Sequence, residues 1–227
     1  MTPANVLDSV RRIIQDGQFL RAPETYTAAT LLVFVNNTIK RMVMLRPDLF
    51  TTVATISTTP SVALQTMPTD SFRLVDIFQV TNANTLEEVD RLQLNRTDIN
   101  WASETAGTPV KFMRHARNPN KYFLYPRPTA GITLQAEYVK IQPTYNLNDT
   151  ITGLPDDYLP AVADGTVYAL LTMESEVNKT QGTILLAKAF GESFVQALGV
   201  SLQMRALTDN DMTPNLQQAG RNLATGS

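Results

Sequence analysis

The chain has 227 residues, a net charge of −2 at neutral pH and no cysteine. The acidic excess disfavours tight binding to a nucleic-acid backbone, which needs a surplus of Lys and Arg. Without cysteine, disulfides, thiolate nucleophiles and cysteine-ligated zinc are excluded. Charged residues make up only 18% of the chain, which fits burial of part of the surface against partner chains.

No membrane segment or signal peptide is expected. Residues 1–17 lack a long apolar stretch followed by a small-residue cleavage site. No uninterrupted apolar run approaches the roughly 20 residues that span a bilayer.

Two helices are expected before residue 48. Thr2 is a hydroxyl N-cap followed by Pro3 at the first helical position, and apolar residues then recur at helical spacing to about residue 16. The second helix begins near Thr25 and ends at Pro47, because proline cannot continue the hydrogen-bond ladder.

β-branched residues and alternating patterns then replace the helical spacing. The segments at 109–116 and 121–125 should form a hairpin, and a short helix containing Trp101 is expected over 96–103. The expected strands are 50–57, 61–66, 72–80, 86–94, 109–116, 121–125 and 132–141.

Helical spacing returns at Pro155, although Gly165 weakens the middle of that helix. A last helix is expected from about residue 180 to 205. Residues 206–227 are polar and contain proline and glycine, so the isolated tail should be disordered.

The predicted fold class is therefore α+β. Two N-terminal and two C-terminal helices form a bundle, an antiparallel β domain is inserted between them, and an extended C-terminal tail follows. The expected bounds are 1–48 with 150–205 for the bundle, 49–149 for the β domain and 206–227 for a tail that becomes ordered on binding.

The sequence offers no catalytic residue, cofactor site or metal site. His115 is the only histidine, which leaves no second histidine for a metal site and no other candidate for a Ser-His-Asp triad. We interpret it as a strand residue that faces solvent or a partner. Glycine-rich phosphate loops are absent from the sequence.

The acidic pairs are better explained structurally than catalytically. Residues 87–88 lie at a turn-to-strand junction, where adjacent side chains point to opposite faces. Residues 156–157 lie in a first helical turn, where acids favour the helix dipole. The segment 209–211 lacks the glycine and the closing glutamate of a calcium loop.

Basic and aromatic residues alternate along the expected hairpin. This pattern permits nucleic-acid binding, but cross-strand aromatic packing with solvated charges is favoured because the chain is acidic. The residues are Lys111, Phe112, Arg114, Arg117, Lys121, Tyr122, Phe123 and Tyr125.

Three stretches combine an aromatic residue with proline or glycine. The first is Trp101-Ala102 with Gly107 and Pro109, before an aromatic and basic strand. The second is Tyr125-Pro126 with Pro128, before a strand with Tyr138 and Pro143. The third is Leu154-Pro155-Asp156 with Tyr158, before a long helix, Asn178-Lys179 and a last helix with Phe194 and Leu198-Gly199.

In this order, over roughly residues 25–200, the stretches resemble the head-to-tail adaptor proteins of podovirus-like tailed bacteriophages. The resemblance implies a non-enzymatic virion protein that forms a ring, typically dodecameric, between the portal protein and the tail nozzle. Tail-fibre proteins attach to some relatives. DNA would pass through the ring without sequence-specific binding, and the chain, made in the host cytoplasm, would reside at the head–tail junction.

We expect the tail to become ordered when it docks into the portal. The apolar side chains that would then be buried are Leu207, Met212, Leu216 and Leu223.

Other functions remain open on the sequence alone. The strand block also suits a tail-tube, nozzle or fibre-attachment subunit, or a general adhesion module. A hydrolase that uses two carboxylates is the enzymatic alternative.

Overall fold

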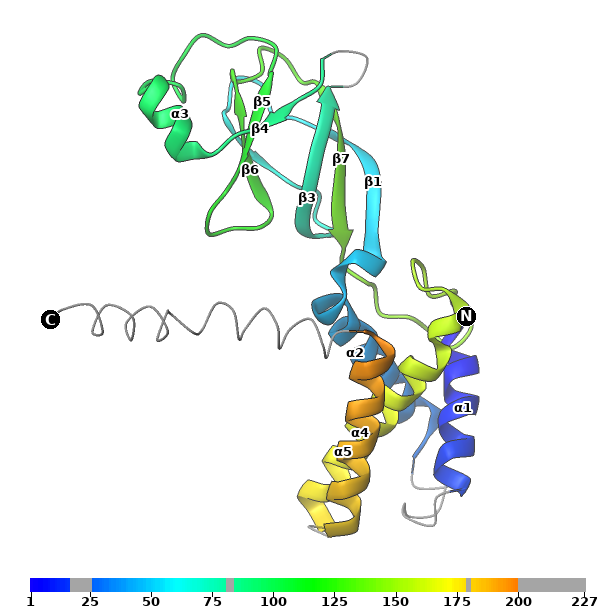
Figure 1. Ribbon diagram of the computed structural model, residues 1–227. Coiled ribbons are helices and arrows are strands. Elements are labelled where there is room, and N and C mark those ends of the chain that lie inside the picture. The colour runs from blue at the N-terminus through cyan, green and yellow to red at the C-terminus, as the bar shows by residue number, and fades with distance from the viewer. Residues whose placement is uncertain (17–25, 81–83, 179–180, 200–227) are drawn as a thin grey trace, which may run out of the picture. The chain divides into compact units, whose positions relative to one another are not determined.

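The computed structural model describes residues 1–16, 26–80, 84–178 and 181–199 (Figure 1). The chain divides into two compact units. The helical unit comprises residues 1–38, 145–151 and the chain from 155 onward, and the β unit comprises 39–144 and 152–154. The α+β prediction is confirmed, whereas the domain bounds inferred from the sequence stay a prediction.

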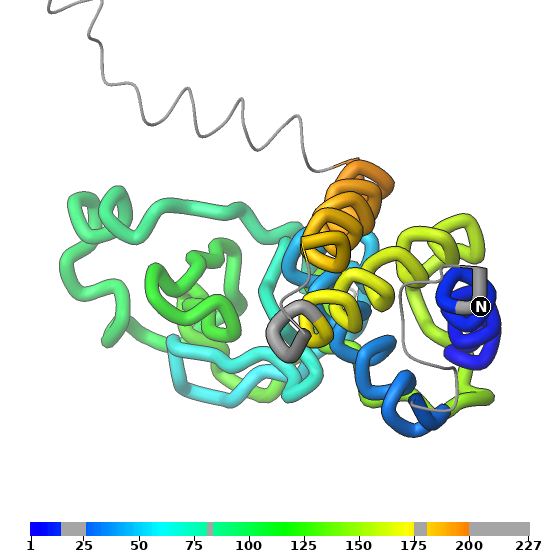
Figure 2. Tube along the Cα trace, turned by 90° about the horizontal axis from the view of Figure 1, so that it is seen from below, coloured from blue at the N-terminus to red at the C-terminus, as the bar shows by residue number. Residues whose placement is uncertain are grey.

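In the helical unit, α4 lies with α1 on one side and α5 on the other (Figure 2). The short 3₁₀ turn η3 directly precedes α4. The helices are α1 Pro3–Asp16, α2 Ala28–Leu45, η3 Asp156–Tyr158, α4 Leu159–Asn178 and α5 Gln181–Ala197. The first part of α2 belongs to this unit, and the division between the units falls within α2, after Thr38.

Hydroxyl caps fix where the first two helices begin. The Thr2 side chain accepts a hydrogen bond from the Asn5 N–H at 3.4 Å, and Thr27 accepts one from the Thr30 N–H at 3.2 Å. Each cap satisfies a backbone donor that the helix itself cannot pair. The second helix therefore begins two or three residues later than the sequence analysis placed it.

By length and composition, α2 is the one described helix that could cross a membrane. Its apolar side chains Leu31, Val35, Ile39 and Met42 are buried within the protein, as in a core helix. The buried Asn36 side chain holds the returning chain: its Nδ2 donates to the Tyr145 carbonyl at 3.1 Å, and its Oδ1 accepts from the Tyr145 N–H at 2.8 Å.

Gly165 in α4 lies against side chains of α2 and α5. A Cβ at this position would be 2.7 Å from Thr38 Cγ2 and 2.8 Å from Phe194 Cδ2. Both distances are shorter than real Cβ contacts. The helix α4 continues through Gly165 without interruption, so the low helix propensity of glycine is offset by the close packing of α2 and α5 against it.

The β unit contains two sheets with a common core (Figure 1). One sheet has the order β1-β7-β3 and the other β2-β6-β5-β4. All pairs are antiparallel except the two-residue pair of β4 with β5. The elements are η2 Pro47–Phe50, β1 Thr51–Ser57, β2 Leu64–Thr66, β3 Ser71–Val80, β4 Glu87–Glu88, α3 Arg91–Thr97, β5 Lys111–Arg114, β6 Lys121–Tyr125 and β7 Thr133–Lys140.

Side chains alternate between the two faces of β5. Phe112 joins the core between the sheets, together with Ile77 and Leu134, whereas Met113 packs with Leu94 and Trp101 in a second cluster. This is the period of two expected of a strand. The predicted hairpin of β5 and β6 is confirmed, with Lys111 opposite Tyr125.

Two predicted elements between residues 86 and 103 are wrong. Only Glu87–Glu88 is strand, and helix α3 begins three residues later, at Arg91. The Asp90 side chain accepts a hydrogen bond from the Leu92 N–H at 2.6 Å, so it caps a helix where the alternation of residues suggested a strand. Trp101 follows that helix in a turn.

We predict that Gly165→Ala destabilises the helical unit by about 1–3 kcal/mol, because the added methyl group overlaps Thr38 and Phe194. Gly182→Ala in α5 is the matched control, since its Cβ would meet nothing within 4 Å. The control should be neutral or more stable by up to about 1 kcal/mol, through helix propensity. Urea denaturation followed by circular dichroism measures both. Equal stability of the two variants would contradict the close packing at Gly165.

Candidate functional site

The first of the three sequence stretches forms a corner after α3. Trp101 is 7% exposed, and its Nε1–H donates to Asn95 Oδ1 at 2.6 Å. The indole contacts Phe123 edge-on, with ring centroids 5.4 Å apart. Trp101 therefore fixes the α3 segment to β6.

The first and second stretches lie together. The Gly107 N–H donates to the Arg127 carbonyl at 2.9 Å, and Gly107 forms a bridge with Pro128. Both Pro109 and Pro128 are buried, and the Tyr125–Pro126 peptide bond is cis. Residues 20 positions apart thus hold one another through the backbone.

The hydroxyl groups of Tyr125 and Tyr138 each donate a hydrogen bond to a carboxylate. Tyr138 is buried and donates to Asp70 at 3.3 Å. Tyr125 donates to Asp98 at 3.2 Å. The Glu104 carboxylate, followed by desolvation and Asp98, raises the pKa of Tyr125 to about 12.

The third stretch begins the helical return. Leu154 is buried in the β unit, and Pro155 leads into η3, where the Tyr158 N–H donates to the Pro155 carbonyl at 3.1 Å. The Asp156 carboxylate forms an ion pair with the amino group of Met1. An acid before α4 also suits the positive end of the helix dipole.

His115 lies just beyond the end of β5, before the turn, so its predicted place within a strand is wrong. It follows β5, and its Nδ1 accepts hydrogen bonds from the Arg117 N–H at 3.2 Å and the Asn118 N–H at 3.1 Å. Its ring stacks on Phe123, with centroids 5.7 Å apart. The imidazole therefore stabilises the turn between β5 and β6.

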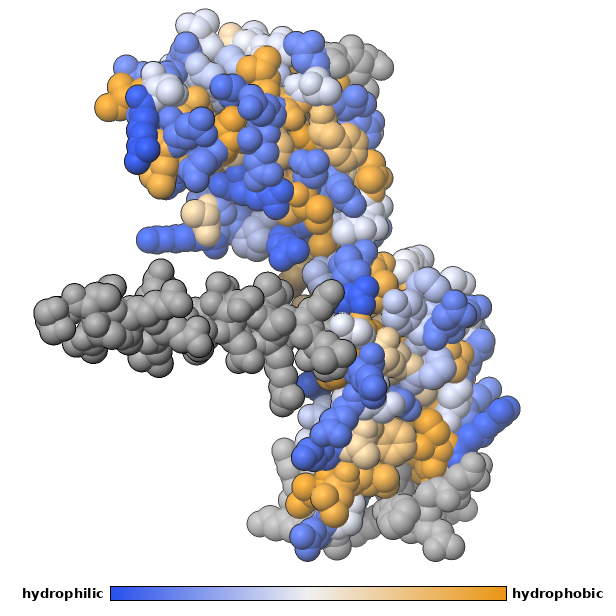
Figure 3. All heavy atoms as spheres, in the orientation of Figure 1, coloured by the Kyte–Doolittle hydropathy of each residue, from blue (hydrophilic) through white to orange (hydrophobic). Residues whose placement is uncertain are grey.

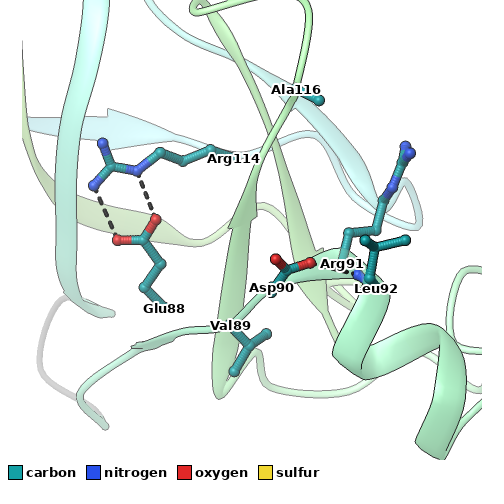
Figure 4. Close-up of a pocket in the computed structure, with 7 residues that line it drawn as sticks. All are labelled: Glu88, Val89, Asp90, Arg91, Leu92, Arg114 and Ala116. Atoms are coloured by element: carbon teal, nitrogen blue, oxygen red, sulfur yellow. Dashed lines mark hydrogen bonds and ion pairs between the residues drawn. The ribbon is translucent and has the colours of Figure 1, made fainter. Parts of the chain in front are cut away.

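A hollow of about 460 Å³ lies where β4 runs into α3, beside β5 (Figure 4). The Arg114 guanidinium binds both carboxylate oxygens of Glu88, with Nε–Oε1 and Nη2–Oε2 distances of 2.7 and 2.9 Å. The Glu88 carboxylate is therefore already paired with a cation, the Arg114 guanidinium. Within the described part of the chain, no three His, Asp or Glu side chains gather in a way that could hold a metal ion.

A second hollow of about 380 Å³ lies between the start of β3 and the β5–β6 turn. Its walls include Arg73, Arg114, His115, Arg117 and Lys121. Leu207, Met212, Leu216 and Leu223, the residues expected to dock into the portal, lie outside the described residues.

The sequence profile of the family described as SU10 adaptor protein matches residues 1–218. The chain belongs to the SU10 adaptor protein family. No curated protein matches the sequence. This adaptor is thus a structural, non-enzymatic component of a bacteriophage virion that works as a head-to-tail adaptor and binds head or tail partners, in agreement with the family inferred from the three stretches.

In the adaptor, the residues of the three stretches bond mainly to their own unit. Trp101, Gly107 and Tyr125 all make polar contacts inside the β unit. Sequence reasoning missed the hollow beside the β5–β6 turn, because Arg73 and Leu74 lie about 40 residues before the rest of its walls.

We predict that Glu104→Gln lowers the pKa of Tyr125 from about 12 toward its ordinary value of 10.0, because the charge that opposes phenolate formation is removed. The raised pKa means that the neutral phenol stabilises the folded adaptor below pH 10 and that this contribution is lost as the pH rises through 12. Phenolate ultraviolet absorbance, with the Tyr125→Phe variant subtracted, measures the pKa. Glu87→Gln, an exposed acid in the same unit, is the control, and a titration of Tyr125 that Glu104→Gln leaves unchanged would contradict the assignment.

Proposed function

We propose that the adaptor forms a ring, dodecameric as in the family it resembles, between the portal protein and the tail nozzle at the head–tail junction. DNA passes through this ring without sequence-specific binding, and the ring is a candidate attachment point for tail-fibre proteins. The observation that carries the proposal is the family match over residues 1–218. The tail-tube, nozzle and hydrolase alternatives have no such support.

A ring needs two different faces on each subunit, because each copy contacts one neighbour with each face. The assembly closes into a ring when the rotation between successive subunits adds up to a full turn. The helical unit offers such unlike faces: α1 lies on one side of α4, and α5 lies on the other (Figure 2). This arrangement supports a side-by-side association of helical units around the ring axis.

Exposed apolar side chains gather at the α4–α5 end of the helical unit (Figure 3). Ile184 is 51% exposed, Leu185 is 62% exposed and Met173 is 36% exposed. Burial of apolar surface is favourable by roughly 25 cal/mol per Å². We assign this apolar end to contact with a second copy of the chain in the ring.

The tail, residues 206–227, is proposed to dock into the portal. Docking would then bury the apolar side chains of the tail only after a portal is present, which would make assembly sequential.

We predict that Leu185→Glu prevents ring formation on purified portals without unfolding the chain, because burial of a carboxylate at the copy–copy contact is strongly unfavourable. Negative-stain electron microscopy of portal–adaptor mixtures counts the rings, and circular dichroism checks the fold. Ile99→Glu, an apolar residue of the β unit that is 86% exposed, is the matched control. Normal rings with Leu185→Glu would refute the assignment of this surface.

We predict that deletion of residues 206–227 abolishes docking to the portal and leaves the melting temperature within a few degrees of the full chain. The measurement is co-sedimentation with purified portal, with thermal unfolding as the folding control. Unchanged docking of the shortened chain would overturn the proposed role of the tail. It would not affect the ring proposal, which the Leu185→Glu experiment tests separately.

A further inference from the structure

The hollow beside the β5–β6 turn is built from a rigid backbone. The Leu74 N–H donates to the Pro119 carbonyl at 3.1 Å, and the Met67 N–H donates to the Asn120 carbonyl at 2.9 Å. His115 holds the turn from inside through its Nδ1. The cationic side chains therefore project from a fixed frame, which lowers the entropy lost when they bind a ligand.

The charges of this hollow are of one sign. Arg114 is held by Glu88 and by the Val75 carbonyl. In contrast, the side chains of Arg73, Arg117 and Lys121 form no hydrogen bond or ion pair with the described part of the chain. No carboxylate lines the hollow. Three cations thus line one hollow without a partner among the described residues, on a chain whose net charge is −2.

Anions are the chemical class that such a hollow attracts. Arginine presents a planar fork of donors that matches phosphate or carboxylate oxygens, and lysine adds a point charge. On the face of the β unit seen in Figure 3, hydrophilic side chains gather around the end where the β5–β6 turn lies.

The walls favour a phosphate backbone over an acidic protein segment. The centre of a protein–protein interface is apolar, with aromatic anchors and few charged residues. Apart from the arginines and the lysine, the walls here are His115, Ala116, Pro119 and the buried Leu74, so they present no large exposed apolar side chain. Interfaces with nucleic acid are far more positive and more polar.

We propose that Arg73, Arg117 and Lys121 form a contact site for the phosphodiester backbone of DNA. The contact reads no sequence, because cations on phosphates carry no base information. This inference rests on the proposed function, in which DNA passes through the ring, and it identifies the residues that touch the passing strand. The acidic balance of the whole chain keeps the contact weak enough to release moving DNA.

The salt dependence of binding follows from the number of cations. Three phosphates neutralised on duplex DNA give a slope of log affinity against log salt of about −2.7. Affinity should fall by about 40-fold between roughly 50 and 200 mM salt.

The test is a fluorescence-anisotropy titration of a labelled random-sequence DNA duplex with the full-length chain. The site variant is Arg73→Gln with Arg117→Gln and Lys121→Gln. We expect it to lose at least about tenfold in affinity at low salt and most of the salt dependence. Circular dichroism checks that the three surface substitutions leave the fold unchanged.

The matched control removes the same charge elsewhere on the β unit, through Arg91→Gln, Arg96→Gln and Lys111→Gln. Equal loss of affinity in the control would reduce the effect to net charge and overturn the site. Tighter binding of polyglutamate than of DNA, with the same residue dependence, would assign the hollow to an acidic protein segment instead. Because the titration needs neither portal nor ring, its failure leaves the adaptor proposal standing, and rings formed by the site variant separate the two results.

Discussion

The helical unit depends on the close approach of α2 and α5 to α4 at one residue without a side chain. At Gly165 the Phe194 ring and the Thr38 methyl group occupy the space that any Cβ would fill. Packed interiors transmit such a constraint, because a displaced ring must displace its own neighbours. The apolar end at Met173, Ile184 and Leu185 belongs to α4 and α5, so the packing of these two helices also positions the surface assigned to a second copy.

Polar side chains in the interior of the protein hold backbone segments in place rather than supply reactive groups. The amide of Asn36 satisfies both backbone groups of Tyr145, and a buried amide left unpaired would cost about 1–3 kcal/mol. His115 similarly uses its ring nitrogen to close a turn. These side chains would be candidates for chemistry in an enzyme, but in this protein they hold segments in register.

Charged side chains are distributed unevenly over the chain, so the net charge does not describe each local surface. Glu88 and Arg114 neutralise each other beside one hollow, whereas the neighbouring hollow keeps three cations unpaired within the described residues. At physiological salt, charges act over roughly 8 Å, so a local cluster determines local binding. An adaptor can therefore be acidic overall and still present a surface that attracts phosphate.

The sequence by itself determined the α+β class, the start of the first helix at the capping Thr2, the β5–β6 hairpin and the family. These depend on local spacing, on capping and on short ordered stretches, all of which act within a few residues. It misplaced the elements between 86 and 103, because a cap at Asp90 competes with strand alternation and only tertiary contacts settle that competition. Only the tertiary structure shows why position 165 requires glycine and which cationic side chains line the same hollow as Arg73. Both depend on residues that are distant in sequence but adjacent in space.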